Sequence, residues 1–409
     1  MALPPRTQRR PSPSRVGTVL LFLLLTPFLL AACTSSRATA MPRPIATATV
    51  PPGGTATVAA AIPTTGVVPP SSTSTTGPAP RPTPTPTPTI PNPPTSTATP
   101  APIGLTEPAF GMTMHFMWYD IARTTKELDQ IQASGLTVAR FDVGWRWVEP
   151  QSKGSYDITY LTKLDTVLQA MDARGIRPIV TVIETPAWAR GAKTGIFAPP
   201  TNMQDYADIM GVLARRYADR PNMVWEIWNE PNLQEFWEPA PNAAAYTDML
   251  RRSYRAIKAD SPNATVLGGA IVFNDLKFLN AMYAAGVAGF FDGLSLHPYA
   301  PGRSPDDRRD PFTSFNAVPE MAAVMRAHGE PDKAIWITEM GWELDMVTDE
   351  TRGKYLARAV ELVRSWPYVR AFCVYTLGQD IAPDGDRFGL IGGNGTPSAS
   401  WIAYTSAAR

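Results

Sequence analysis

Apolar, strand-like runs alternate with amphipathic, helix-like segments from about residue 104 to the end of the 409-residue chain. The segment Ile158–Arg174 is typical of the second kind, with apolar residues at Leu161, Leu164, Val167, Leu168 and Met171. This spacing places them on one face of a helix, which packs against a core. Strict alternation over eight strand–helix units is typical of a parallel sheet that closes on itself. We therefore predict an α/β fold, a single (β/α)8 TIM barrel, for residues 104–409.

The predicted strands are short apolar runs with the predicted helices between them. The strands are Phe110–Trp118, Leu136–Trp145, Ile176–Glu184, Met223–Trp228, Thr265–Ala270, Gly293–Tyr299, a seventh that ends at Glu339, and Val369–Thr376. Four of the helices are expected near Thr124–Ser134, Ile158–Arg174, Asn202–Ala218 and Asn242–Ala259. Thr265–Ala270 is a short strand and the least distinctive of the eight. The charged, proline-containing segment Ala300–Phe312 is predicted to be a loop beside the cleft.

The N-terminal 32 residues have the pattern of a secretory signal. Four arginines, the last of them Arg15, precede the apolar run Val16–Ala32. This run closes with Leu30-Ala31-Ala32-Cys33, which resembles the bacterial lipobox and implies that Cys33 carries a lipid. An uncleaved membrane helix is the alternative, but an apolar run interrupted by Pro27 is short for a span. We expect an exported cell-envelope lipoprotein, anchored to the outer face of a bacterial membrane.

Residues 33–103 are rich in threonine, proline and serine, and they hold 18 of the 43 prolines of the chain. Such a composition lacks the apolar residues that a core needs. We predict a disordered linker that holds the barrel away from its anchor.

Composition and charge narrow the function of the barrel. The 37 basic and 36 acidic residues leave a net charge of +1, which suggests no broad basic surface for nucleic acid and favours a neutral substrate. The two cysteines exclude a disulfide framework, and Cys373 in the last strand is expected in the core. The sequence contains neither a His-Glu-x-x-His zinc motif nor a glycine-rich phosphate loop. We expect no metal, no cofactor and a monomer.

Two of the predicted strands run directly into a glutamate. The strand Met223–Trp228 leads into Asn229-Glu230-Pro231, and Pro231 cannot donate to a strand ladder, so the strand ends beside Glu230. The seventh strand leads through Thr338 into Glu339. In a barrel of parallel strands, active sites lie at the carboxyl ends of the strands. Both carboxylates are therefore candidates for chemistry at one face of the barrel.

These two segments resemble the catalytic motifs of retaining glycoside hydrolases of clan A, with families 5 and 39 the nearest. Trp228-Asn229-Glu230-Pro231-Asn232 resembles the acid/base motif, and Ile335 to Trp342 resembles the nucleophile motif. The resemblance implies that Glu230 is the acid/base, that Glu339 is the nucleophile, and that a neutral, β-linked poly- or oligosaccharide is hydrolysed. A non-catalytic carbohydrate-binding barrel and a transglycosylase remain as alternatives.

The chain departs from the family pattern at the end of strand eight. Tyr375-Thr376-Leu377 stands where the family often has a tryptophan that forms the floor of the sugar site. We expect the sugar platform to come from elsewhere, with Trp188 and Trp342 as candidates, or else as plain core residues. Trp145, Trp147 and Trp237 are expected to be packing residues.

Further polar residues are expected around the two glutamates. Alternation on the second strand places Val138, Arg140 and Asp142 on one face. Arg140 and Tyr299 are candidates to keep Glu339 ionised. We assign Asn229 to the sugar 2-hydroxyl, His297 to orienting Glu230 or the sugar, and Glu184 to the side of the cleft. A structural ion pair between Arg140 and Glu226, and a purely interior role for His297 and Tyr299, remain open.

Overall fold

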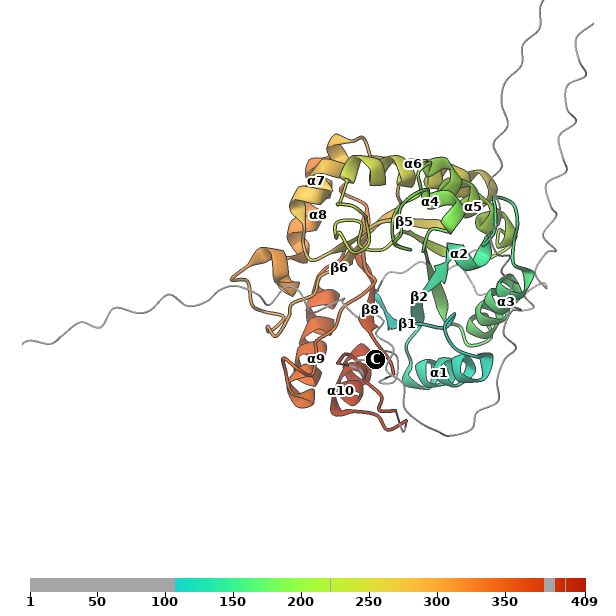
Figure 1. Ribbon diagram of the computed structural model, residues 1–409. Helices are drawn as coiled ribbons and strands as arrows, with labels where there is room; N and C mark the ends of the chain where they lie inside the picture. Colours follow the sequence, from blue (N-terminus) through green and yellow to red (C-terminus); the bar gives the residue numbers. More distant parts are fainter. Residues whose placement is uncertain (1–106, 221, 379–386, 394) are drawn as a thin grey trace, which may run out of the picture. The chain divides into compact units, whose positions relative to one another are not determined.

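The computed structural model describes residues 107–220, 222–378, 387–393 and 395–409. These residues form a closed barrel of eight parallel strands in sequence order, with helices around its outside, so the prediction of a TIM barrel is confirmed (Figure 1). The strands are β1 (Ala109–Met114), β2 (Val138–Gly144), β3 (Arg177–Ile183), β4 (Val224–Ile227), β5 (Thr265–Val272), β6 (Gly293–His297), β7 (Ala334–Ile337) and β8 (Val369–Tyr375).

The helices agree with the predicted pattern where the apolar stripe is long. They are α1 (Ile121–Ser134), α2 (Trp145–Val148), α3 (Ile158–Asp172), α4 (Ala187–Arg190), α5 (Met203–Arg216), α6 (Ala243–Asp260), α7 (Leu276–Ala284), α8 (Val318–Ala327), α9 (Asp349–Ser365) and α10 (Ala399–Ala408), with short 3-10 turns η1 (Pro311–Thr313) and η2 (Phe315–Ala317). Gly135 ends α1 with a φ of 85°, a left-handed conformation that glycine adopts without strain. The single-turn helices α2 and α4 and the C-terminal α10 were not predicted.

The interior of the barrel changes from apolar to polar along the strands. Its apolar part is Ala109, Val138, Ile179, Val224, Leu267, Trp336, Ala371 and Cys373. Cys373 is therefore a core residue, as expected. Two residues further along their strands, Arg140, Thr181 and Glu226 are buried on the same inward face. The polar side chains thus lie toward the carboxyl end of the barrel, and the apolar residues fill its interior closer to the amino ends of the strands.

Strand β5 is longer than predicted and carries an irregularity. It extends to Val272, and its register with β6 shifts between Gly268 and Ile271. Within this bulge Gly269 has a φ of 116° and Ala270 a φ of 45°. The turned backbone allows the Ala270 carbonyl to accept a hydrogen bond from the Glu230 N–H at 3.1 Å. The strand described as least distinctive in the sequence therefore helps to position Glu230.

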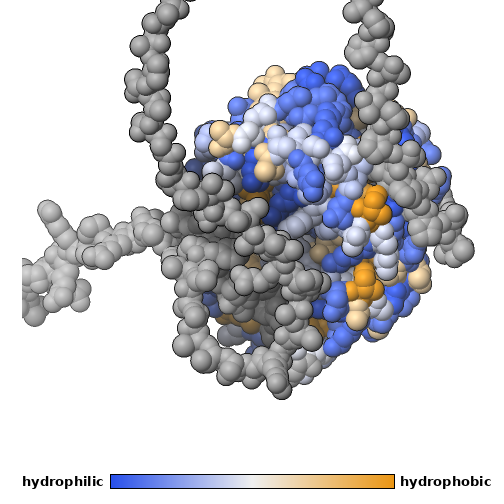
Figure 2. Space-filling model, turned by 45° about the vertical axis from the view of Figure 1, so that its right-hand side comes forward, coloured by the Kyte–Doolittle hydropathy of each residue, from blue (hydrophilic) through white to orange (hydrophobic). Residues whose placement is uncertain are grey.

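The outer surface of the barrel is mostly polar on the face drawn in Figure 2, where hydrophobic residues form small, separate spots. Trp118 and Trp147 are the most exposed tryptophans among the described residues, with exposed fractions of 59% and 50%. Helices long and apolar enough to cross a membrane were not found among the described residues. The predicted signal, Cys33 and the linker all lie outside the described residues.

Candidate active site

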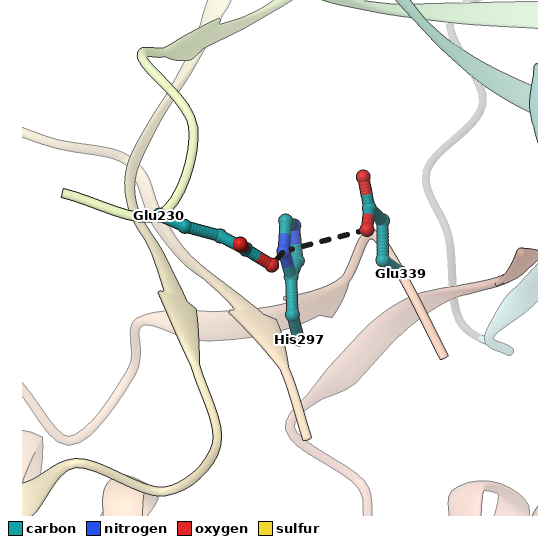
Figure 3. A group of neighbouring side chains, drawn as sticks. All are labelled: Glu230, His297 and Glu339. Carbon is teal, nitrogen blue, oxygen red and sulfur yellow. Dashed lines mark hydrogen bonds and ion pairs between the residues drawn. The ribbon is translucent and has the colours of Figure 1, made fainter. Parts of the chain in front are cut away.

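The two glutamates face one another across the imidazole of His297 (Figure 3). Glu230 follows β4, Glu339 follows β7, and His297 is the last residue of β6. His297 Nδ1 lies 2.9 Å from Glu230 Oε1 and 3.7 Å from Glu339 Oε2. One oxygen of each carboxylate and one ring nitrogen all lie within 4.8 Å of one another. Two residues 109 positions apart in the sequence thus meet at one buried point.

The backbone around Glu230 is held in an unusual conformation. Trp228 and Glu230 have φ values of 67° and 43°, in the left-handed region that side chains other than glycine rarely adopt. Such a residue costs on the order of 1–3 kcal/mol, so the surroundings must impose it. The fully buried Trp228 indole packs against Tyr206 and Trp237 and donates to the Phe236 carbonyl at 2.7 Å. The aromatic residues of the motif therefore anchor the segment that carries Glu230.

Arg140 lies under both motifs and contacts three acceptors. It donates from Nη1 to Glu339 Oε1 at 2.5 Å, from Nε to Glu226 Oε2 at 2.9 Å, and from Nη2 to Asn229 Oδ1 at 2.6 Å. The guanidinium is 1% exposed. Burial opposes its charge, but Asp142, Glu339 and Glu226 outweigh burial and raise the pKa of Arg140. One side chain thus contacts both Glu339 and Glu226, the two partners considered for Arg140 from the sequence.

Tyr299 supports Glu339 from the other side. Its hydroxyl donates to Glu339 Oε2 at 2.9 Å. Burial and the neighbouring Glu339 charge raise the pKa of Tyr299, so the phenol stays a neutral donor. Two donors thus converge on the Glu339 carboxylate, and both stabilise negative charge there.

Glu230 has a different environment from Glu339. It is buried, and its side chain pairs with the imidazole of His297 and not with an arginine. Burial raises the pKa of Glu230, His297 opposes this shift, and the Glu339 charge adds to it. The imidazole also contacts the Thr338 hydroxyl through Nε2 at 3.1 Å. The site therefore pairs Glu339 with a cation and raises the pKa of Glu230.

Asp142 and His115 belong to the site but were not assigned to it from the sequence. Asp142 Oδ1 lies 3.1 Å from Arg140 Nη1, and burial raises the Asp142 pKa to about 6. Its place on the same strand face as Arg140 was visible in the alternation of β2. His115 directly follows β1, and burial lowers its pKa to about 4. The Glu339 charge opposes this shift, and the Arg140 charge adds to it. His115 lay inside the predicted strand Phe110–Trp118, and it follows the strand only because β1 ends at Met114.

Glu184 lies at the end of β3 and pairs with an arginine. Its Oε2 accepts from Arg146 Nε at 2.7 Å, and its φ is 68°. Gly144 leaves room for this pair, because a Cβ there would lie 2.5 Å from Glu184 Oε2. The Glu184 charge also contributes to the raised pKa of Asp142. Glu184 is thus bound to Arg146 and not to the central carboxylates.

The tryptophans singled out in the sequence agree with their predicted roles in part. Trp342 is 1% exposed and packs against Phe315 and Tyr355, so it is a core residue and not the sugar platform, because a covered indole has no face for a ligand. Trp188 is half-buried and packs edge-on against Trp145. Trp145 and Trp237 are buried packing residues, but Trp147 is 50% exposed, so its predicted packing role is corrected.

The Glu230, His297 and Glu339 group has ligand atoms close enough together to hold a metal ion. Arg140 already places a positive charge 2.5 Å from Glu339, which disfavours a second cation at the same carboxylate. The donor set is therefore better suited to two carboxyls in different protonation states.

This chain is similar to known families and proteins that are glycoside hydrolases. Residues 98–367 match the family described as Cellulase (glycosyl hydrolase family 5). A β-xylosidase of Geobacillus stearothermophilus is 24% identical over 300 residues, which covers 63% of this chain and 57% of the relative. A coniferin β-glucosidase of Pinus contorta is 24% identical over 113 residues, 27% of this chain and 22% of the relative. The chain thus spans little more than half of the first curated relative and about a fifth of the second.

Solved structures with the same fold include two glycoside hydrolases. A family 39 enzyme from Bacteroides cellulosilyticus WH2 superposes with a TM-score of 0.62 at 24% identity, covering 75% of this chain and 64% of that one. GH5_18 from Streptomyces cattleya has a TM-score of 0.63 at 19% identity, covering 75% and 80%. At these identities the likeness is one of fold.

Proposed function

The chain belongs to the cellulase family, glycosyl hydrolase family 5, and we propose on this premise that it is a retaining glycoside hydrolase. It cleaves O-glycosidic bonds of a neutral, β-linked oligo- or polysaccharide by double displacement. The curated relatives are called a β-xylosidase and a β-glucosidase, names that refer to neutral sugars in β linkage and support this substrate class.

The spacing of the two carboxyl groups carries the proposal. One oxygen of Glu230 and one of Glu339 lie within 4.8 Å of each other. Retaining enzymes hold their carboxyls about 5–5.5 Å apart, whereas inverting enzymes need about 6.5–9.5 Å to fit a water molecule beside the sugar. The short separation supports direct attack by one carboxylate on the anomeric carbon.

The surroundings of each glutamate support one assignment of roles. Glu339 accepts from Arg140 and Tyr299, so it is ionised and acts as the nucleophile. Glu230 is buried with a raised pKa, so it retains a proton for the leaving group. The activity should fall as the pH rises through the raised pKa of Glu230, because the general acid is then lost.

The His297 imidazole lies between the two glutamates and shares a proton with Glu230. Its Nδ1 lies 2.9 Å from Glu230 Oε1, and its Nε2 contacts the Thr338 hydroxyl at 3.1 Å. Burial opposes a charge on the imidazole, but Glu339 and Glu230 outweigh burial and raise the pKa of His297. The pair of Glu230 and His297 therefore supplies the proton for the leaving group.

The reaction proceeds in two displacements. In the first, a Glu339 oxygen bonds to the anomeric carbon, the glycosidic C–O bond breaks, and the Glu230 proton passes to the departing oxygen. In the second, water attacks the anomeric carbon, its proton returns to Glu230, and the Glu339 carboxylate is released. Asn229, oriented by Arg140 through its Oδ1, presents its amide N–H₂ to the sugar 2-hydroxyl.

Replacement of Glu230 with alanine tests both the roles and the stereochemistry. The variant should form the covalent intermediate from an activated aryl glycoside, which needs no proton to depart, but should break it down slowly. Azide, a nucleophile that needs no base, should restore the rate and give a β-glycosyl azide from a β-glycoside. An α-glycosyl azide, or no rescue, would contradict the assignment of Glu230.

We also propose that the enzyme works at the cell envelope. The support is the resemblance of Leu30-Ala31-Ala32-Cys33 to a lipobox and the linker-like composition of residues 33–103. A lipid on Cys33 would anchor the chain, and the linker would let the barrel reach polysaccharide beyond the membrane surface.

A further inference from the structure

The turn after β1 carries a histidine and a tryptophan in a stacked pair. The rings of His115 and Trp118 have centroids 4.3 Å apart and an interplanar angle of 26°. The Trp118 N–H donates to the His115 carbonyl at 2.9 Å, which holds the two side chains on the same turn. Trp118 is 59% exposed, so its outer face is open while its inner face covers the imidazole. The pair stands at the carboxyl end of the barrel because β1 ends at Met114.

The imidazole of His115 is buried without a hydrogen-bond partner. The residue is 5% exposed, and neither Nδ1 nor Nε2 meets a donor or acceptor among the described residues. A buried polar group left unpaired is destabilising, so such groups are rare and call for a physical cause. Because burial lowers its pKa to about 4, the ring is neutral at physiological pH, with one nitrogen that donates and one that accepts.

The other two histidines of the chain show that this state is exceptional. His297 uses both ring nitrogens, toward Glu230 and Thr338. His328 stacks on Tyr283 with centroids 4.1 Å apart, much as His115 stacks on Trp118, but its Nε2 contacts Asn280 at 3.1 Å. His328 is exposed and can also meet solvent, whereas His115 is buried. His115 instead keeps its polar atoms unused beside the carboxylates.

A row of aromatic rings connects this pair with the nucleophile. His115 contacts Tyr375 edge-on at 5.7 Å, Tyr375 contacts Phe388 at 5.4 Å, and Phe388 contacts Tyr299 at 5.9 Å. The row ends at the Tyr299 hydroxyl, which donates to Glu339. It therefore runs from the exposed face of Trp118 to the reacting centre. Tyr375 is the first residue of the segment Tyr375-Thr376-Leu377, which stands in place of the strand-eight tryptophan.

We propose that His115 and Trp118 form a sugar-binding subsite that replaces this tryptophan platform. Trp118 stacks on the apolar face of a neutral sugar ring, and the His115 imidazole forms a hydrogen bond with one of its hydroxyls. A hydroxyl both donates and accepts, so it matches a neutral imidazole. The proposal rests on the proposed glycosidase function and specifies where that enzyme recognises its substrate.

The test combines side-chain and substrate deletions. His115→Phe keeps a ring against Trp118 but removes both nitrogens, and His328→Phe makes the same change on a stacked histidine far from the barrel mouth. Each variant is assayed in the full chain with p-nitrophenyl β-xyloside, p-nitrophenyl β-glucoside and their monodeoxy analogues. Removal of one particular hydroxyl should lower kcat/KM of the wild type about 10- to 100-fold.

Removal of the same hydroxyl should leave kcat/KM of His115→Phe unchanged, because the imidazole that would bind this hydroxyl is already absent. His328→Phe should lose the same factor as the wild type. Trp118→Ala, a change on an exposed residue that leaves the fold intact, should raise KM with little change in kcat, since stacking binds ground and transition states alike. If every monodeoxy substrate loses the same factor in His115→Phe as in the wild type, the subsite is overturned while the glycosidase function stands.

Equilibrium binding separates the two proposals when no glycoside is hydrolysed. Xylobiose and cellobiose are titrated calorimetrically into the wild type, His115→Phe and His328→Phe. Binding weakened at least about 10-fold by His115→Phe alone supports the subsite in a barrel that binds sugar without cleaving it. Equal binding by all three proteins, or no binding by any of them, overturns the subsite.

Discussion

Replacing Arg140 with methionine would leave two buried carboxylates without their cation. Glu226 is fully buried and accepts a hydrogen bond from Arg140 Nε at 2.9 Å, while Glu339 accepts one from Arg140 Nη1 at 2.5 Å. Methionine has a similar length, so the change removes charge and hydrogen bonds with little change in volume. Breaking a buried ion pair by removing one partner costs about 3–5 kcal/mol. A domain has about 5–15 kcal/mol of stability, so Arg140→Met should fold but unfold at a lower urea concentration.

A second substitution separates the buried charge from other effects of losing Arg140. Glu226→Gln removes the negative charge and keeps an acceptor for the Thr181 hydroxyl, which lies 2.6 Å from Glu226 Oε2. The double variant Arg140→Met/Glu226→Gln should therefore recover most of the lost stability. It should not recover activity, because Glu339 still lacks the Arg140 donor. Arg215→Met is a matched control, since the Arg215–Asp260 pair is exposed and worth about 0.2–1 kcal/mol at most.

The loss of stability in Arg140→Met should depend on pH. Burial opposes the charge on Glu226, but Arg140 and its other neighbours lower its pKa in the wild type, so this carboxylate stabilises the fold above its unfolded pKa. Without Arg140, burial should raise the Glu226 pKa above its unfolded value. Protonation then relieves the cost in acid, so the destabilisation should be greatest near pH 7 and smaller near pH 4.5.

Urea unfolding followed by tryptophan fluorescence at these two pH values measures the effect. A loss under about 1 kcal/mol would refute the view of Arg140 as the counter-charge of a buried carboxylate, since that view requires about 3–5 kcal/mol. An equal loss at both pH values, or no recovery in the double variant, would refute it as well.

Three further predictions concern single residues. Glu339→Gln should abolish turnover of aryl glycosides with an unchanged circular dichroism spectrum, and near-wild-type turnover would exclude Glu339 as the nucleophile. Burial raises the pKa of Asp142 to about 6, so its ionisation between pH 4 and 7 should lower the stability of the folded state by about 2–3 kcal/mol. Urea midpoints should show this loss in the wild type but not in Asp142→Asn. Parallel pH profiles of the two proteins would argue against this cost of ionisation. Cys33→Ser should release the protein from membranes, as fractionation would show, because only a thiol accepts the lipid; unchanged membrane association would rule out a lipobox.

Local sequence patterns determined the elements of the barrel and the place of its two glutamates. The helical stripe of α3, the left-handed Gly135 after α1 and the proline after Glu230 act within a few residues, so they are visible in the sequence. The two-residue period of a strand likewise placed Arg140 and Asp142 on one inward face. Since carboxyl ends of parallel strands meet at one edge of a barrel, Glu230 and Glu339 could be expected at the same face.

The partners across the barrel were decided by the tertiary structure alone. Arg140 reaches Glu339 across 199 residues, and the bulge of β5 turns the Ala270 carbonyl toward Glu230. Both depend on strand register and closure, which no local pattern specifies. The same is true of the tryptophans, because Trp342 is covered by η2 and α9 while Trp118 is left open. Whether an aromatic side chain packs or faces a ligand depends on which distant element covers it, and this is a property of the closed barrel.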